Sequence, residues 1–210
     1  MGKNKLRKRI YLFAACCLAI IVLWLSCARR EIKNLDSKGK NIICFGDSIS
    51  FGYGVLPSQA YPKYLETLLG RKVINAGVDG DTTTEALKRI KEDVLSRDPY
   101  LVIIEFGGND FLRKVPREIT FKNLALMVDK VQAQGAIVAV TDISAGLLMR
   151  EYRCPYKKIA LDREAIFVPS IMKGIITNPK MKSDFFHPNE EGYKIIADRV
   201  YRAIKPYIKD

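Results

Sequence analysis

The sequence is poor in the residues that build metal sites. Histidine occurs once among 210 residues, as His187, and cysteine occurs five times. A single histidine excludes a histidine-rich zinc site, and the cysteines do not have metal-ligand spacing. A disulfide between Cys44 and Cys154 is disfavoured, because Cys44 falls in a predicted central strand, where a thiol is rarely exposed. The sequence therefore predicts no bound metal.

Nucleotide-binding signatures are also missing. Gly46, Gly52 and Gly54 lie close together but do not have the spacing of a dinucleotide fingerprint, and no Gly-Lys-Ser/Thr follows them. The formal net charge is +12, but residues 1–40 hold ten Lys/Arg against two Asp/Glu. Residues 41–210 carry 25 Lys/Arg and 21 Asp/Glu, a net charge of only +4. We therefore expect no cofactor and no nucleic-acid partner.

Residues 1–28 have the pattern of a membrane-targeting segment. Five Lys/Arg precede an uncharged run over residues 10–28. As a helix this run would span about 28 Å, close to the ~30 Å hydrocarbon core of a bilayer. The basic cluster predicts a domain on the outer face of the cytoplasmic membrane, in a bacterial periplasm or at the cell surface.

The same segment fits either an uncleaved anchor or a signal peptide. Leu25-Ser26-Cys27 ends the run as a lipoprotein signal would, although Trp24 stands where leucine is usual. Residues 29–40 are polar and charged and indicate a linker. Residues 41–210 then form one domain of ordinary size.

Within residues 41–210, short apolar runs alternate with amphipathic segments. We predict strands over residues 42–45, 72–75, 101–106 and 136–141. We predict helices over residues 61–69, from Thr82 with Glu85 as its capping-box partner, over 119–134, over 156–166 and after Asn189. A short strand over 165–168 competes with the end of the fourth helix. The alternation predicts an α/β fold, a flavodoxin-like three-layer sandwich with a parallel sheet of about five strands and helices on both faces.

Polar residues follow three of the predicted strands. Ser48 follows the first within Gly-Asp-Ser, Gly80 the second within Gly-Asp-Thr, and Asn109 the third within Gly-Gly-Asn-Asp. In open α/β sheets the carboxyl ends of parallel strands share one edge, where ligands bind. We therefore expect these groups to converge, although Asp47 and Ser48 have the alternative role of capping the next helix.

The single histidine lies just before the last helix. Asp184 precedes His187 by three residues, a spacing at which the carboxylate can reach one ring nitrogen and fix the tautomer. The other nitrogen is then free to take a proton from a serine hydroxyl. A lone histidine is otherwise more often structural, so the spacing from Asp184 is the feature that favours chemistry.

Four motif blocks occur in order along the chain. They are Phe45-Gly46-Asp47-Ser48, Asn75-Ala76-Gly77 with Gly80-Asp81-Thr82, Glu105-Phe106-Gly107-Gly108-Asn109-Asp110 with Leu112-Arg113, and Asp184-x-x-His187-Pro188-Asn189. Together they resemble the SGNH hydrolases, also called the GDSL family, and within it the lysophospholipase, thioesterase and arylesterase branch. The resemblance covers nearly all of residues 41–210 and is thinnest over 146–179.

The resemblance implies a role for each site residue. Ser48 would be the nucleophile, His187 its general base, and Asp184 the carboxylate that orients His187. The backbone N–H groups of Ser48 and Gly80 and the side-chain amide of Asn109 would form an oxyanion hole for the tetrahedral intermediate. The alternatives for Gly80 and Asn109 are a turn glycine and a cap.

The implied reaction is the hydrolysis of small or medium acyl esters through an acyl-enzyme intermediate, with lysophospholipids and thioesters among the candidates. Deacetylation of carbohydrate or cell-wall polymer, and a non-catalytic ligand-binding domain of the same fold, are the alternatives. We expect residues 146–179 to wall an acyl groove. Its candidate side chains, which otherwise only cover the core, are Leu147, Leu148, Met149, Tyr152 and Tyr156.

Overall fold

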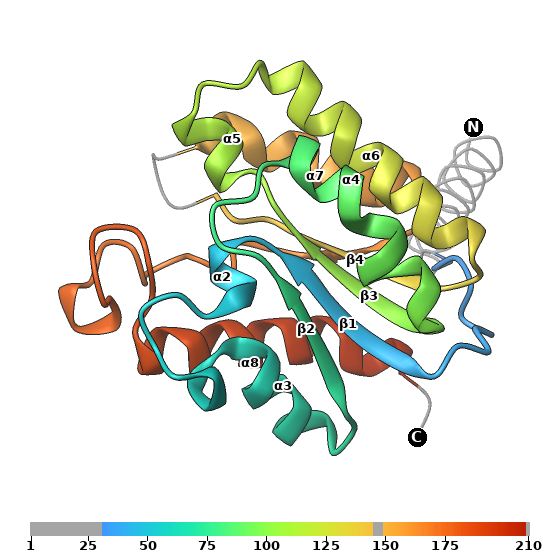
Figure 1. The fold of residues 1–210 in the computed structure, drawn as a ribbon, viewed down its shortest axis with the longest axis horizontal. Coiled ribbons are helices and arrows are strands. Elements are labelled where there is room, and N and C mark those ends of the chain that lie inside the picture. The colour runs from blue at the N-terminus through green and yellow to red at the C-terminus, as the bar shows by residue number, and fades with distance from the viewer. Residues whose placement is uncertain (1–30, 145–148, 209–210) are drawn as a thin grey trace, which may run out of the picture. The chain divides into compact units, whose positions relative to one another are not determined.

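A five-stranded parallel sheet forms the centre of the fold in the computed structural model, which describes residues 31–144 and 149–208 (Figure 1). The strands are β1 (Asn41–Gly46), β2 (Val73–Gly77), β3 (Pro99–Glu105), β4 (Ile137–Thr141) and β5 (Ile166–Val168). Their order in the sheet is β2-β1-β3-β4-β5. All four pairings are parallel, so the predicted flavodoxin-like α/β fold is confirmed.

The middle of the sheet is apolar on both sides. Every residue of β3 and β4 is buried, and so are five of the six residues of β1. Parallel strands carry helices on both faces, which explains why these segments are continuous apolar runs and do not alternate with polar residues. The prediction that the run over 101–106 forms a central strand is therefore confirmed.

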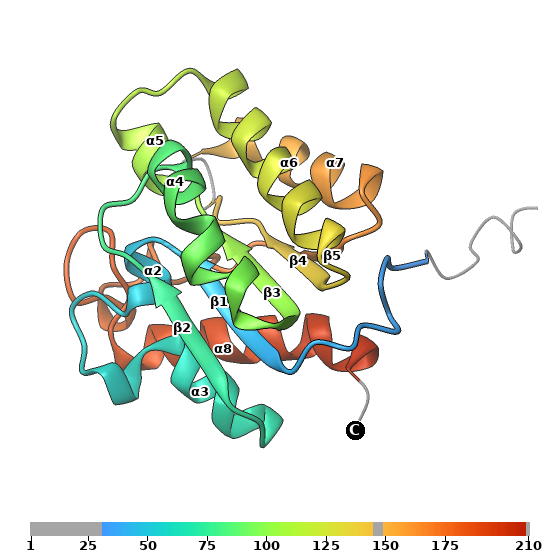
Figure 2. The ribbon, with the colours of Figure 1, turned by 45° about the vertical axis from the view of Figure 1, so that its right-hand side comes forward.

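Helices cover both faces of the sheet (Figure 2). The helices α3 (Tyr61–Leu69) and α8 (Glu190–Ile204) pack together on one face, next to β2 and β5. The other face is covered by α4 (Thr83–Asp93), α6 (Arg117–Ala133) and α7 (Arg153–Asp162). The sheet and these two helix layers form the predicted three-layer sandwich.

Local signals set several helix ends as predicted. Thr82 and Glu85 form the capping box of α4, and the Asn189 side chain accepts a hydrogen bond from the backbone N–H of Gly192 at the start of α8. The helix predicted over 156–166 is wrong at both ends. It begins at Arg153 and ends at Asp162, because Ile166 pairs with Ala139 in the sheet.

The segment before β1 is more ordered than a linker would be. Ile32 is buried in the core, and the side-chain amide of Asn34 donates to the carbonyl oxygens of Gln132 (2.9 Å) and Ala136 (3.0 Å). The linker predicted over 29–40 is thus wrong from Ile32 onward, because this residue packs in the domain core. The apolar run over 10–28 lies outside the described residues, and no helix within 31–144 or 149–208 has the length and apolar character of a membrane span.

Two short helices follow strands that are neighbours in the sheet. The helix α2 (Ser48–Phe51) follows β1, and α5 (Gly108–Leu112) follows β3. Both are too short to show an apolar period, so the sequence did not predict them. The chain reverses its direction across the sheet between β1 and β3, and in such folds the crevice at this switch point binds ligands.

Candidate active site

The first strand delivers Ser48 to the carboxyl edge of the sheet. Asp47 caps α2 by accepting a hydrogen bond from the backbone N–H of Ile49 (3.1 Å), and Ser48 is the first residue of that helix. A Cβ atom on Gly46 would lie 2.1 Å from the Ser50 hydroxyl oxygen, so the approach of the strand to this turn requires glycine. The predicted capping role of Asp47 and the placement of Ser48 after a strand both hold.

A tight loop before α8 holds His187 and Asp184. Asp184 Oδ1 accepts hydrogen bonds from the backbone N–H groups of Phe186 and His187, each at 2.8 Å. The backbone N–H of Ser183 donates to the carbonyl oxygen of His187 (3.0 Å), and this hydrogen bond joins the two ends of the loop. Asp184 is therefore fixed by its own loop and does not depend on the imidazole for its position.

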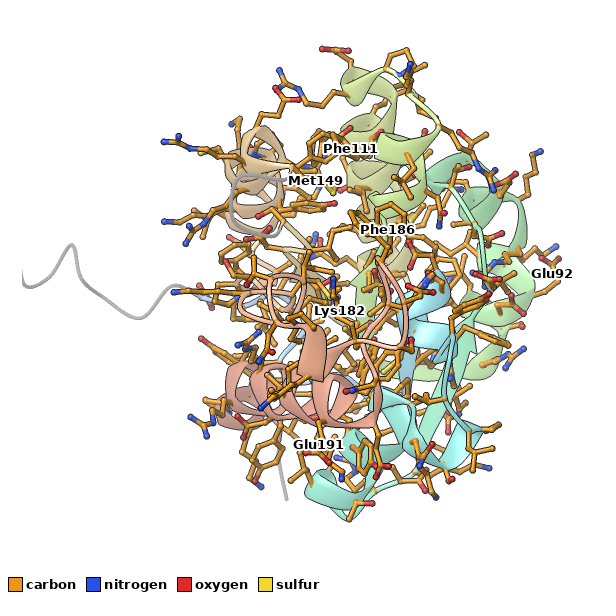
Figure 3. All side chains as sticks on the ribbon, turned by 90° about the vertical axis from the view of Figure 1, so that its left-hand side faces the viewer. Glu92, Phe111, Met149, Lys182, Phe186 and Glu191 are labelled. Carbon is orange, nitrogen blue, oxygen red and sulfur yellow. The ribbon has the colours of Figure 1, made fainter. Side chains whose placement is uncertain are left out.

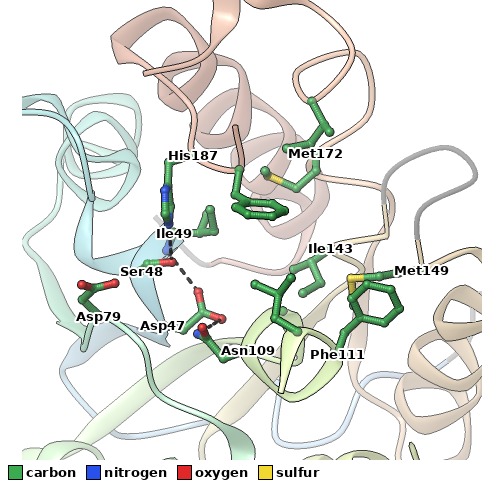
Figure 4. A pocket seen from close by; sticks show the side chains of 14 residues that line it. Asp47, Ser48, Ile49, Asp79, Asn109, Phe111, Ile143, Met149, Met172 and His187 are labelled. Carbon is green, nitrogen blue, oxygen red and sulfur yellow. Dashed lines mark hydrogen bonds between the residues drawn. The ribbon is translucent and has the colours of Figure 1, made fainter. Parts of the chain in front are cut away.

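Ser48, His187 and Asp184 form a continuous hydrogen-bonded series, of which Figure 4 shows the contact between Ser48 and His187. His187 Nε2 lies 3.1 Å from Ser48 Oγ, and His187 Nδ1 lies 2.7 Å from Asp184 Oδ2. Partial burial raises the pKa of Asp184, but hydrogen bonds from the His187 ring and from backbone N–H groups outweigh it and lower the pKa below its usual value. Asp184 thus stays ionised and can orient the imidazole.

An aromatic contact that the sequence did not reveal also fixes the histidine. The ring of Tyr53 lies 4.4 Å from that of His187 between centroids, at an interplanar angle of 35°. Tyr193 donates from its hydroxyl to the backbone carbonyl oxygen of Tyr53 (3.0 Å), so α8 supports the stacking residue. Nothing in the spacing of Tyr53 from the motif blocks marks this role.

The three candidate oxyanion donors come to the same edge. Asn109 Nδ2 donates to the carbonyl oxygen of Asp81 (3.0 Å) and to Asp47 Oδ2 (3.3 Å), which holds the amide between the two loops. Gly80 has a φ of +81°, which glycine adopts without strain. Within the described residues, the backbone N–H groups of Ser48 and Gly80 make no hydrogen bond.

Two arginines that the sequence did not mark as site residues brace these loops. Arg89 donates to the carbonyl oxygens of Gly46 (3.0 Å) and Ala76 (2.9 Å) and pairs with Asp81 (2.5 Å). Arg113 donates to the carbonyl oxygen of Gly80 (2.7 Å). Arg89 of α4 therefore connects the loop of Ser48 to the loop of Gly80, and Arg113 connects the Gly80 loop to the end of α5.

Three carboxyl groups next to the site are buried and hydrogen-bonded. Glu105 Oε2 accepts from the backbone N–H (3.2 Å) and the hydroxyl (2.9 Å) of Ser50, and Asp110 accepts from Thr83. Burial raises the pKa of Asp47 to about 7, and burial followed by the nearby charge of Asp47 raises the pKa of Glu105 well above its usual value. All three carboxyl groups thus have structural hydrogen bonds.

An apolar pocket of about 160 Å³ opens beside Ser48 (Figure 4). Its walls away from Ser48 are apolar side chains from α5, from the chain after β4 and from the chain after β5: Phe111, Leu112, Ile143, Met149, Met172 and Ile176. Figure 3 shows Phe111, Met149 and Phe186 on the face of the molecule that carries the pocket.

The groove residues predicted from the sequence divide into three groups. Met149 lines the pocket as predicted. Tyr152 and Tyr156 do not, because both are buried in the core, where the Tyr156 hydroxyl donates to the carbonyl oxygen of Phe106 (2.8 Å). Leu147 and Leu148 lie outside the described residues.

Cysteine chemistry and metal ligation play no visible part at this site. Cys44 is a free, buried thiol whose pKa is raised to about 12 by burial, and Cys154 is free and exposed. Among residues 31–144 and 149–208, no group of three or more His, Cys, Asp or Glu has the geometry of a metal site.

The hydroxyl–imidazole–carboxylate series supports nucleophilic attack on an acyl carbon. On a flavodoxin-like sheet, it places the protein in the class of SGNH-type carboxylic ester hydrolases. Comparison with family models agrees with this placement. Residues 44–195 match the GDSL-like Lipase/Acylhydrolase family, and the chain belongs to that family.

Its relatives are esterases and thioesterases. The Escherichia coli protein named as a thioesterase, protease and lysophospholipase is 29% identical over 175 residues, which cover 80% of this chain and 84% of that protein. Esterase TesA of Pseudomonas aeruginosa is 27% identical over 203 residues, 91% and 96% of the two chains. The crystal structure of esterase EstA from Pseudoalteromonas sp., inhibited by monoethylphosphonate, has a TM-score of 0.71 at 28% identity and covers 80% and 98%. The predicted family and branch are confirmed.

Proposed function

We propose that this protein hydrolyses small or medium acyl esters through an acyl-enzyme intermediate on Ser48. The observation that carries the proposal is the series from Ser48 through His187 to Asp184, which lies at the mouth of an apolar pocket. A nucleophile at the opening of an apolar pocket can attack an acyl group whose chain lies inside it. Lysophospholipids and thioesters share this chemistry and belong to the proposed range.

The geometry supports a two-step reaction. His187 Nε2 accepts the Ser48 proton while Ser48 Oγ attacks the carbonyl carbon, and the protonated His187 then donates that proton to the leaving alkoxide or thiolate. Asp184 accepts a hydrogen bond from Nδ1–H and stabilises the imidazolium. A water molecule, deprotonated by His187, then releases the acid and restores Ser48.

The negative oxygen of each tetrahedral intermediate requires donors that are already in place. The N–H groups of Ser48 and Gly80 and the Asn109 amide are the proposed donors. The Asn109 amide exchanges its contact with Asp81 for the developing oxyanion. One such donor contributes about 3 kcal/mol in other hydrolases.

The apolar pocket supports selection by acyl length. Each methylene that the pocket buries contributes roughly 0.8 kcal/mol, a several-fold gain in kcat/KM. The rim adds apolar surface of its own, because Leu112 is 50% exposed and Phe186 is 39% exposed. Apolar side chains around a pocket mouth favour a hydrophobic substrate or a lipid surface.

The test uses p-nitrophenyl esters from acetyl to decanoyl. Activity should rise with each methylene until the pocket is full and then level off. Ile176→Trp should fill the pocket and lower the ratio of octanoyl to acetyl activity, whereas Ile119→Trp, on the exposed start of α6, should leave the ratio unchanged. A flat profile would contradict the acyl pocket, and a sharp preference for acetyl would indicate a deacetylase.

The nucleophile is tested separately from the substrate range. Ser48→Ala should abolish turnover of every ester while the thermal unfolding temperature stays close to that of the wild type. Ser58→Ala removes an exposed hydroxyl that is not at the site and serves as the control. Wild-type activity in Ser48→Ala would refute the proposed mechanism.

We also propose that residues 1–28 place the domain on the outer face of the cytoplasmic membrane. The basic cluster ahead of an uncharged run of nearly membrane-spanning length supports this orientation. Protease added to spheroplasts should remove the domain together with a known exported marker. Survival of the domain while the marker is cleaved would contradict the proposal. Mass spectrometry of the mature N terminus would separate an intact anchor from a lipid-modified Cys27.

A further inference from the structure

A second pocket, of about 460 Å³, lies next to the acyl pocket and has the opposite character. It is lined by four cationic side chains from different parts of the chain: Arg150 on the turn before α7, Arg153 on α7, Lys173 after β5 and Arg199 on α8. Residues 41–210 carry a net charge of only +4. The four cations of this pocket alone equal the net positive charge of residues 41–210. The pocket is therefore not part of a uniformly basic surface.

The two pockets share three short stretches of backbone. Ile143, Met149 and Met172 line the acyl pocket, while their direct neighbours Ser144, Arg150 and Lys173 line the basic pocket. No residue lines both pockets, and Ser48 lines the acyl pocket only. The basic pocket is thus a separate site behind the wall of the acyl pocket, away from Ser48.

The carboxylate of Asp142 already accepts four hydrogen bonds from two serines that line this pocket, Ser144 and Ser170. Asp142 is fully buried; its Oδ1 accepts from the backbone N–H (2.9 Å) and hydroxyl (2.5 Å) of Ser144, and its Oδ2 from those of Ser170, both at 3.2 Å. Arg153 Nε lies 3.8 Å from Oδ2, at the limit of an ion pair. One carboxylate therefore offsets at most one of the four cations.

The other cations have no acidic partner among the described residues. Arg199 Nη1 donates to the carbonyl oxygens of Ile171 (2.7 Å) and Ser170 (3.4 Å), which fixes the guanidinium without neutralising it. The acid next to Arg150, Glu151, pairs with Arg117 instead. Outside the described residues, the one acidic side chain is that of Asp210.

We propose that this pocket binds a phosphate-type anion. Arginine presents a planar fork of donors that matches phosphate oxygens, and lysine adds a point charge. Three unneutralised cations that converge on one concave surface repel each other, and a bound dianion removes that repulsion. The same chemistry fits free phosphate, a phosphomonoester and the phosphodiester of a lipid headgroup.

The test measures phosphate binding to the full-length chain in a mild non-ionic detergent. Inorganic phosphate should raise the thermal unfolding temperature above that in KCl of equal ionic strength. The double variant Arg150→Gln/Lys173→Gln should weaken phosphate binding by about tenfold or more, since a charge-assisted hydrogen bond contributes at least that factor. Lys122→Gln/Lys157→Gln removes the same charge from exposed positions of α6 and α7 and should bind phosphate as the wild type does.

Ligand competition distinguishes the sources of the anion. Glycerol 3-phosphate and glycerophosphocholine present a monoester and a diester. Displacement of inorganic phosphate by the diester would identify a lipid-headgroup site, and displacement by the monoester alone would identify a site for free phosphate or phosphomonoesters. Equal unfolding temperatures in phosphate and KCl, or unchanged phosphate affinity in the Arg150/Lys173 variant, would overturn the proposal. Ser48→Ala should retain phosphate binding, so the result does not depend on the proposed esterase mechanism.

Discussion

Replacing Arg89 by lysine should impair catalysis without touching a group that contacts the substrate. Its guanidinium donates to Asp81 Oδ2, to Asp93 Oδ2 and to the carbonyl oxygens of Gly46 and Ala76. A lysine ammonium keeps the charge but has one nitrogen, which cannot span these four acceptors. The guanidinium also lies 4.6 Å from the centre of the Phe45 ring, a contact that lysine would weaken.

The expected magnitudes follow from the lost contacts. At least two of the four hydrogen bonds should be lost at about 1–1.5 kcal/mol each, which predicts a loss of about 2–3 kcal/mol in the free energy of unfolding. The side chain is only 18% exposed, so water replaces these bonds poorly. The loops of Ser48 and Gly80 then lose their shared brace. Loss of one oxyanion donor lowers kcat by up to about 10²–10³-fold in other hydrolases. For Arg89→Lys, where the donor is displaced and not removed, we expect kcat to fall by about ten- to a hundredfold.

The assay separates a positioning role from a purely structural one. kcat and KM for p-nitrophenyl butyrate are measured where urea titration shows the variant to be folded. The fall should appear in kcat, with KM within about threefold of the wild-type value, because the acyl pocket is unchanged. Arg97→Lys is the control, since Arg97 shares the Asp93 carboxylate but contacts neither loop. A folded Arg89→Lys protein with wild-type kcat would refute the reasoning.

Three further predictions concern the same edge of the sheet. His187→Ala should reduce kcat nearly as severely as Ser48→Ala; kcat within tenfold of the wild type would contradict a role as general base. Asn109→Ala should lower kcat by about 10²-fold or more and change KM little, whereas an effect confined to KM would indicate a substrate contact. Because burial raises the pKa of Asp47 to about 7 and also raises the pKa of Glu105 well above its usual value, the folded protein binds more protons than the unfolded chain between about pH 4 and 7. The contribution of this pair to the free energy of unfolding should therefore be lost as pH rises through that window. Urea titrations should show that Asp47→Asn loses less of its free energy of unfolding over this range than the wild type does. Identical pH profiles of the two proteins would refute the assignment.

Much of the fold and of the candidate active site can be predicted from short-range features of the sequence. Apolar runs closed by glycine predict the buried strands, and the Thr82–Glu85 pair predicts the start of α4. The hydrogen bond between Asp184 and His187 joins residues three apart and so depends mostly on one loop. The four motif blocks identify the family because each is a local pattern at the end of a strand or the start of a helix.

Only the tertiary structure decided which side chains surround these residues. Tyr152 and Tyr156 were candidates for the acyl groove on their amphipathic character, but both are buried, with their rings against Phe121 of α6. Met172 and Ile176 line the pocket instead, and no local pattern distinguishes them from core residues. Arg89 contacts Gly46 across 43 positions of sequence. Contacts of this kind arise from the order of the strands and the packing of helices across them, which a local pattern does not encode.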